Sequence, residues 1–240
     1  DIELRTLLSR ATDEELEPLL DCILDKDRSG RISSDLDTDP EYRAHPHEPS
    51  RYWKKIGEEI QRYGGNTFAN MFRGGVGVCY HEILVDVAKQ LKLNFNENSE
   101  SERIELLLMN KIFEDAWDAM SPEERARVIQ ETGMKNVSKA TSGPAMTIAL
   151  QAALRAGGFA TYQFTVIVVN MVWWILFGHG LKIATNAALT RAMGVFLGPI
   201  GWTITGIWLA IDLAGPAFRV TVPAVLQIAL IRQSQMMRNA

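Results

Sequence analysis

Charge is nearly missing from the last 100 residues of this 240-residue chain. Residues 141–240 hold one acid, Asp212, and six bases, whereas residues 1–140 hold 28 acids and 19 bases. Because an ordinary soluble domain is about one quarter charged, the C-terminal part cannot present a normal solvated surface. We therefore divide the chain into an acidic amphipathic helical region, residues 1–140, and an apolar helical region, residues 141–240, that belongs in a bilayer or in an unusually apolar core.

Cysteine is scarce as well, and its spacing excludes the usual cysteine chemistry. Cys22 and Cys79 are too far apart in sequence for a disulfide framework or a zinc motif. Cys79 and His81 are two residues apart on a predicted helix, so they face different sides. Residues 25–32 match the start of a calcium-binding EF-hand loop, but Leu36 takes the twelfth position, where the bidentate Glu belongs. We expect neither a metal nor a cofactor.

Alternating strand patterns are also absent, and helical periodicity predicts an all-α fold. Thr12 and Glu15 form a capping box that begins a helix over residues 13–25. Residues 25–50 turn polar and contain three prolines, which predicts a long exposed connection.

Further helices follow in the acidic region. Ser50 is predicted to cap a helix that stops at Gly64 and Gly65, where the left-handed conformation carries no steric penalty. Apolar spacing predicts helices over residues 78–91 and 101–120.

Two long uncharged runs dominate the apolar region. The 26 residues between Arg155 and Lys182 contain no charged side chain, and residues 162–177 form their most apolar part. A second run covers residues 192–211. About 20 helical residues span the roughly 30 Å of a bilayer's hydrocarbon core, so both runs are long enough to cross it. The fold class is therefore a multi-helix bundle with a very apolar C-terminal helical hairpin.

Aromatic and small side chains mark the faces that this hairpin would use. Small residues let helices approach closely in lipid, although they also occur in tight soluble cores. The expected membrane-associating residues are Tyr162, Phe164, Val168, Trp173, Trp174, Phe177, Trp202 and Trp208. The expected helix-packing residues are Gly194, Gly198, Gly206 and Ala210.

A third apolar segment, residues 216–232, is less suited to spanning because Pro223 interrupts it. Asp212 and Arg219 lie two helical turns apart and form a possible charge pair, since each would need a partner in a low-dielectric setting. The alternative is that they are ordinary charges at helix ends.

Motifs in both regions carry a family resemblance. They are Trp53-x2-Ile56-x2-Glu59-Ile60-x3-Gly64-Gly65-Asn66-Thr67-x2-Asn70 with Arg73-Gly74 and Tyr80-x-Glu82-Ile83-Leu84-x-Asp86-Val87, then Gly178-His179-Gly180-Leu181, and last Gly215-Pro216-Ala217-Phe218-Arg219-Val220-Thr221-Val222-Pro223-Ala224-Val225-Leu226-Gln227-Ile228-Ala229. Over residues 10–232 the chain resembles the YaaW family of uncharacterised bacterial proteins. The first stretch also resembles, more weakly, the domain of ubiquinol-cytochrome c chaperones, which are helical assembly factors. Neither resemblance implies known catalytic residues.

Three functional interpretations remain open. The first is a non-enzymatic protein that associates with or inserts into membranes, with pore formation by a permeabilising effector as its extreme form. The second is a chaperone or assembly factor at the membrane surface, and the third is a soluble homo-oligomer that buries its apolar helices. No nucleophile, base and orienting group come together in the sequence, so we expect no enzyme.

The expected partners and location follow from the same charge distribution. We expect a lipid bilayer or a membrane protein as partner, self-association as a further option, and no nucleic acid because residues 1–140 are acidic. The expected location is the bacterial cytoplasm, peripheral to or inserted in the inner membrane.

Overall fold

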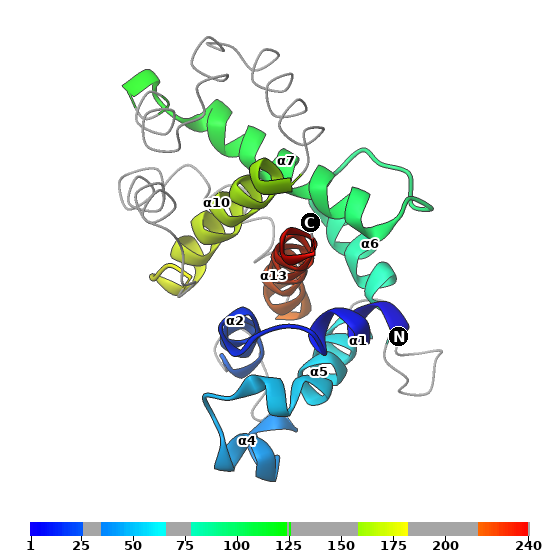
Figure 1. Ribbon diagram of the computed structural model, residues 1–240. Helices are drawn as coiled ribbons and strands as arrows, with labels where there is room; N and C mark the ends of the chain where they lie inside the picture. The colour runs from blue at the N-terminus through cyan, green and yellow to red at the C-terminus, as the bar shows by residue number, and fades with distance from the viewer. Residues whose placement is uncertain (26–34, 66–77, 124, 126–157, 182–215, 240) are drawn as a thin grey trace.

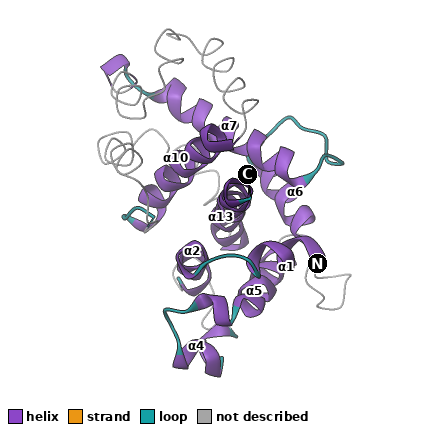
Figure 2. Ribbon diagram, in the orientation of Figure 1, coloured by secondary structure: helices purple, strands orange, loops and turns teal. Residues whose placement is uncertain are grey.

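The computed structural model describes residues 1–25, 35–65, 78–123, 125, 158–181 and 216–239. In these ranges every regular element is a helix and no strand is present (Figure 2), so the expected all-α class is confirmed. The α-helices are α1 (Ile2–Leu8), α2 (Asp13–Leu24), α4 (Pro40–Ala44), α5 (Trp53–Gly65), α6 (Tyr80–Gln90), α7 (Ser101–Ala119), α10 (Gly158–Phe177) and α13 (Pro216–Arg238). The expected hairpin stays a prediction, because residues 192–211 lie outside these ranges.

Helix α13 lies at the centre of the described helices (Figure 1). It contacts α1, α2, α5, α6, α7 and α10. A helix that is apolar on all sides has to be surrounded by protein or lipid, and here protein surrounds it. The side chains that this arrangement buries completely are Val220, Ala224, Val225, Leu226, Ile228 and Ile231. The sequence predicted an interruption at Pro223, but α13 continues through this proline, because packing on all sides outweighs one lost backbone hydrogen bond.

Helices α2 and α10 point in the same direction, and α13 runs opposite to both. Arg238, at the end of α13, donates a 2.6 Å hydrogen bond to Glu15 near the start of α2. Tyr162, near the start of α10, lies at the same end of the bundle, because the charges of Glu15 and Arg238 act on the pKa of its hydroxyl. Trp173, near the end of α10, reaches Asp21 near the end of α2. The C-terminal ends of α2 and α10 therefore meet.

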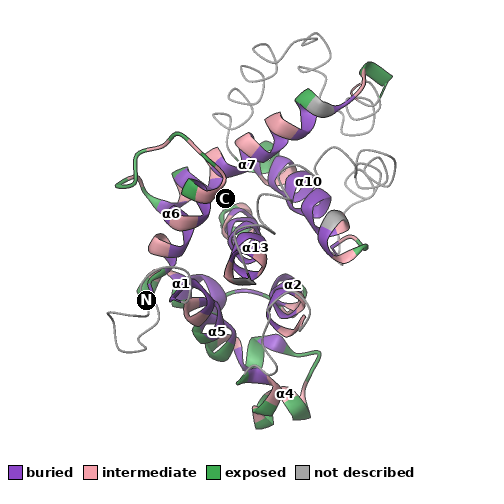
Figure 3. Cartoon of the chain, turned by 180° about the vertical axis from the view of Figure 1, so that it is seen from behind, coloured by how far each residue is buried: buried purple, intermediate pink, exposed green. Residues whose placement is uncertain are grey.

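The most apolar segment of the sequence, α10, is covered by protein along most of its length (Figure 3). It packs against α13 and α7, and Phe113 of α7 meets Phe164 edge to face, with ring centroids 5.4 Å apart. Among the described residues, no helix meets the length and hydropathy needed to cross a membrane. The apolar run that resembles a membrane span forms core contacts in this structure.

Local signals for helix α2 act as the sequence predicts. The Thr12 amide donates to Glu15 Oε2 over 2.9 Å, and the Glu15 amide donates to Thr12 Oγ1 over 3.4 Å. These two hydrogen bonds are the predicted capping box, and α2 ends at Leu24, within one residue of the predicted end.

The polar connection after α2 holds more structure than the sequence predicts. It contains two short 3-10 helices, η1 (Leu36–Thr38) and η2 (Pro49–Arg51), on either side of α4. Asp39 Oδ1 caps α4 by accepting from the amides of Glu41 and Tyr42. Ser50 lies inside η2, so its predicted role as the cap of α5 is wrong.

Gly64, near the end of α5, serves close packing rather than a left-handed helix end. Both belong to α5, and the only glycines with positive φ in the described ranges are Gly158 and Gly178. A Cβ on Gly64 would lie 2.7 Å from Ile83 Cδ1 and 2.9 Å from Val78 Cγ2. The glycine therefore lets α5 and the start of α6 approach closely, a reason that the sequence pattern did not distinguish from a helix end.

Candidate functional site

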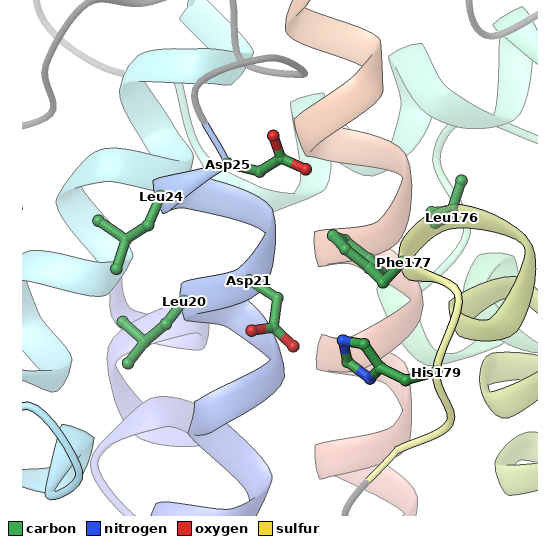
Figure 4. A pocket seen from close by; sticks show the side chains of 7 residues that line it. All are labelled: Leu20, Asp21, Leu24, Asp25, Leu176, Phe177 and His179. Carbon is green, nitrogen blue, oxygen red and sulfur yellow. The ribbon is translucent and has the colours of Figure 1, made fainter.

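An open pocket lies where the C-terminal ends of α2 and α10 meet. Its volume is about 370 Å³, near the lower end of the range for ligand sites. In Figure 4, Asp21 and Asp25 point from α2 toward Phe177 and His179. The complete lining is Leu20, Asp21, Leu24, Asp25, Leu176, Phe177 and His179, and we call it the α2–α10 pocket.

The end of α10 places His179 in this pocket. Gly178 has φ of +72° and its amide donates to the Trp174 carbonyl over 3.1 Å, which is the left-handed helix end that glycine favours. Two residues later, the buried amide of Leu181 donates to Asn170 Oδ1 over 2.9 Å. The chain is therefore fixed on both sides of His179, whose side chain stays exposed.

Gly180 is needed for the same turn. A Cβ at this position would lie 2.7 Å from Trp174 Nε1 and 2.8 Å from Asn170 Oδ1. The Gly178–Leu181 motif of the sequence is thus a helix-ending turn that requires glycine at both positions for steric reasons. The histidine between them is the polar side chain that the turn presents to the pocket.

Two of the residues that line the pocket are aspartates at the C-terminal end of helix α2. The C-terminal end of a helix carries a partial negative charge, so bases rather than acids are favourable there. Helix α2 has no base in its last turn, yet Asp21 and Asp25 lie at this end. Helix α10 also has no base in its last turn. Antiparallel α13 begins at the same end, so its positive N-terminus offsets one of the two negative helix ends.

The acidic surface extends from the pocket along α2. Asp13, Glu17 and Asp21 follow one another at intervals of four residues, which places them on one side of the helix. Burial, the neighbouring Tyr42, and then Asp13 and Glu17 raise the pKa of Tyr52 to about 12. Burial is the largest of these causes, and the two carboxylates of α2 add to it.

Aromatic rings form the α10 side of the pocket. Phe177 and Trp173 pack with ring centroids 5.0 Å apart, and Trp173 is completely buried. The Trp173 indole nitrogen lies 3.5 Å from Asp21 Oδ2, so the carboxylate side and the aromatic side of the pocket touch. Carboxylates beside an aromatic face attract cations both by charge and by the ring quadrupole.

A second polar cluster lies inside the bundle, around Arg232 of α13. The Arg232 guanidinium donates to Glu105 Oε2 over 2.8 Å and to Glu3 Oε1 over 2.6 Å. Tyr80 donates to Glu105 Oε1 over 2.7 Å, and Ser101 donates to Glu3 Oε2 over 3.0 Å. The cluster therefore joins α13 to α1, α6 and α7 through charge-assisted hydrogen bonds.

Burial controls the titration of this cluster. Desolvation raises the pKa of Glu105, although Arg232 and Tyr80 act in the opposite direction. Burial would lower the pKa of Arg232, but the Glu105 carboxylate holds it above the usual value. Arg232 thus stays charged, and its partners are already engaged. These contacts fit a structural role, and the described residues contain no group of three side chains able to hold a metal ion.

The residues predicted to associate with a membrane lie in several environments. Phe164, Val168 and Trp173 are buried inside the protein, whereas Tyr162, Trp174 and Phe177 are partly buried. Arg219 is partly buried in the first turn of α13. The remaining predicted site residues lie outside the described ranges: Trp202, Trp208, Gly194, Gly198, Gly206, Ala210 and Asp212. Membrane association and the charge pair therefore stay predictions.

The sequence analysis included Phe177 among its predicted site residues, but it did not predict the aspartates on the other side of the pocket. The available signal was a pair of aspartates one helical turn apart at the C-terminal end of a predicted helix. The cluster around Arg232 gave no such signal, because Glu3, Tyr80 and Glu105 are far from Arg232 in sequence.

Comparison with known proteins shows to which family this chain belongs. The family model described as "Ubiquinol-cytochrome C chaperone" matches residues 48–226. A UPF0174 protein of Helicobacter pylori strain J99 is 39% identical over 90% of this chain and 85% of its own length. Another from strain 26695 is 40% identical over 84% of this chain and 97% of its own length. No solved structure matches significantly.

The YaaW resemblance is confirmed by a third relative. The UPF0174 protein YaaW of Escherichia coli K12 is 30% identical over 79% of this chain and 74% of its own length. The chaperone similarity extends further than the sequence motifs suggested, because the match continues through α10 and into α13.

Replacing Arg232 tests whether its cluster holds α13 in place. Arg232→Met leaves the buried Glu105 carboxylate without its cation, and loss of one partner of a buried pair costs about 3–5 kcal/mol. We expect urea unfolding of the intact chain to show a loss of this size. The double variant Arg232→Met with Glu105→Gln should recover part of the loss, and equal stability of the two variants would argue against coupling.

The pH dependence of stability tests the burial of Glu105. Because its folded pKa is raised above the ordinary value of 4.5, its contribution to the free energy of unfolding is present below that value. This contribution is lost as the pH rises through the folded pKa. The stability of wild type minus that of Glu105→Gln should therefore shrink as the pH rises above 4.5. A difference that stays constant or grows across urea titrations would contradict this sign.

Proposed function

Because this chain belongs to the UPF0174 family and to the family described as ubiquinol-cytochrome C chaperone, we propose that it is a chaperone or assembly factor. In this proposal it holds apolar helices of a partner protein until the partner assembles. The family match over residues 48–226 carries the proposal, and it covers α5, α6, α7, α10 and part of α13. The α2–α10 pocket is the place where a client segment would dock.

The arrangement of the helices fits transient binding of an apolar client. Helices α10 and α13 pack against one another and against neighbouring helices. Their apolar surfaces are therefore already covered within the described part of the chain. The pocket, in contrast, is open and combines leucine, phenylalanine and carboxylate side chains. Such a mixed surface can hold an apolar segment without burying a large area, which keeps binding reversible.

The membrane-inserting interpretation receives less support. Burial of α10 against α13 and α7 explains its apolar sequence through core packing. The pocket and the family match favour a role in which the apolar helices that meet lipid belong to the client rather than to this chain.

An aggregation assay tests the chaperone proposal directly. A detergent-solubilised helical membrane protein is diluted below the critical micelle concentration, and light scattering follows its aggregation. We expect the intact chain, at an equimolar amount or in excess, to suppress the scattering. Leu24→Glu should weaken this effect because it adds charge to the apolar part of the pocket.

Leu93→Glu is the matched control for that variant. Leu93, like Leu24, is a partly buried leucine packed against the core, but it does not line the pocket. Absence of suppression by the wild type at every ratio would refute the chaperone proposal. Equal loss of suppression in both variants would move the docking site away from the pocket.

We place this activity at the cytoplasmic side of the bacterial inner membrane, where helical membrane proteins are assembled. Support comes from the bacterial origin of the relatives and from the apolar client that the proposal requires. Cell fractionation should then find the intact chain peripheral to the membrane, released by alkaline carbonate washing. Retention in the washed membrane would instead indicate insertion. Self-association remains a secondary prediction that light scattering of the purified chain measures.

A further inference from the structure

We propose that His81 and Ser101 form a proton-sensitive relay that sets how tightly the cluster around Arg232 holds helix α13. The relay is a row of hydrogen bonds that runs from the surface to this cluster. His81 Nδ1 lies 3.1 Å from Ser101 Oγ, and Ser101 Oγ donates to Glu3 Oε2 over 3.0 Å. The other carboxylate oxygen of Glu3 accepts from Arg232 over 2.6 Å. This inference goes beyond the proposed chaperone function and does not depend on it.

The relay lies where four helices come together. His81 is in the first turn of α6 and Ser101 is the first residue of α7, whereas Glu3 belongs to α1 and Arg232 to α13. In Figure 1, α1 and α6 lie on the same side of α13. His81 is partly buried, and only 6% of Ser101 is exposed. The row of hydrogen bonds therefore connects solvent to the interior of the bundle.

The second ring nitrogen of His81 fixes where its hydrogens are. His81 Nε2 lies 2.8 Å from the backbone carbonyl oxygen of Glu97, and a carbonyl oxygen can only accept. Lys89 Nζ donates to the Glu97 carboxylate over 2.8 Å, which holds this loop residue in place independently. Nε2 therefore carries a hydrogen, and a neutral His81 has none on Nδ1. The protonation state of the ring is expressed at the nitrogen that faces Ser101.

The hydroxyl of Ser101 has only one hydrogen to donate. When His81 is protonated, Nδ1 donates to Ser101 Oγ, and the hydroxyl hydrogen goes to Glu3. When His81 is neutral, Nδ1 and Glu3 Oε2 both require that hydrogen, so one of the two acceptors goes without it. A hydrogen bond to a charged group is stronger than a neutral one. Loss of the proton from His81 therefore weakens the contact that anchors Glu3 beside Arg232.

Charged groups face the relay from the elements that pack around it, so the test has to distinguish them from His81. Helix α5 faces α6 through the uncharged Gly64 and Gln61. Burial raises the pKa of Glu105, which makes it the main group to be separated from His81. The charged groups around the relay are Asp1 and Glu3 at the start of α1, Glu82 and Lys89 on α6, Glu97 in the following loop, Glu105 on α7 and Arg232 on α13.

A double-mutant cycle at two pH values tests the relay in the intact chain. Urea unfolding gives the unfolding constants of the wild type, Ser101→Ala, His81→Gln and the double variant at about pH 5 and about pH 8, between which histidine changes its charge. Protonated His81 lets Ser101 make both hydrogen bonds, so the stabilisation by Ser101 is complete at the acidic end and falls as the pH rises. We expect the ratio of the unfolding constants of Ser101→Ala and wild type to fall by about three- to tenfold over this range.

Two backgrounds serve as controls for this cycle. With His81→Gln, the effect of Ser101→Ala should be the same at both pH values, because glutamine does not titrate. Glu105 is present in all four proteins, so its titration cannot produce a difference that depends on His81. With His45→Gln, the pH dependence of the wild type should be retained. His45 Nδ1 also lies 3.1 Å from an oxygen atom, Glu48 Oε1, but this contact is exposed and does not belong to the relay.

The results that would overturn the relay are distinct from those that support it. A ratio that stays constant or rises with pH would overturn it. A fall that persists in the His81→Gln background would also overturn it, since another group would then be the one that titrates.

NMR of the wild type decides the question if Ser101→Ala does not fold. The nitrogen shift of His81 Nδ1 follows the loss of its hydrogen, and the Nε–H resonance of Arg232 reports on the cluster. We expect both signals to change with the same midpoint, and His81→Gln to abolish the change at Arg232. An Arg232 resonance that does not follow His81 would refute the relay.

Discussion

Neutralisation of Arg232 on the central helix α13 is the constraint on which the bundle depends. Helix α13 is the centre against which six other helices pack, and its apolar surface explains most of this packing. Arg232 is an exception, because a guanidinium cannot enter such a core without partners. Glu105 and Glu3 supply them, and they come from α7 and α1. The charge therefore fixes which sides of α13 face which helices, a specificity that apolar contacts alone provide poorly.

The same central helix determines where the candidate site lies. Since α2 and α10 both pack against α13 and run in the same direction, their C-terminal ends meet. Neither helix has a base in its last turn, and Asp21 and Asp25 line the pocket from the end of α2. Phe177 at the end of α10 adds an aromatic ring, and the turn after the helix adds His179. The site is thus a consequence of helix polarity as much as of the side chains that line it.

Local features were predictable from sequence, and non-local ones were not. The Thr12 capping box and the limits of α2, α6 and α7 follow from neighbouring residues, so they were found to within a few positions. The hydropathy of the sequence identifies the apolar segments but not what covers them. A valine such as Val166 or Val225 has the same hydropathy whether lipid or protein surrounds it. Pro223 indicated a break that packing overrides. The pocket depends on Asp21 meeting Phe177, which no local pattern encodes.

The position of α13 in the chain has a consequence for the order of folding during synthesis. A ribosome makes α13 after all the other described helices, yet it fills the space between helices that were made much earlier. The contact between Glu3 and Arg232 joins residues 229 positions apart, so it cannot form until α13 has emerged. Contacts of such long range slow folding and leave apolar surface exposed in the meantime. Until α13 has emerged, the six described helices that pack against it lack their central partner.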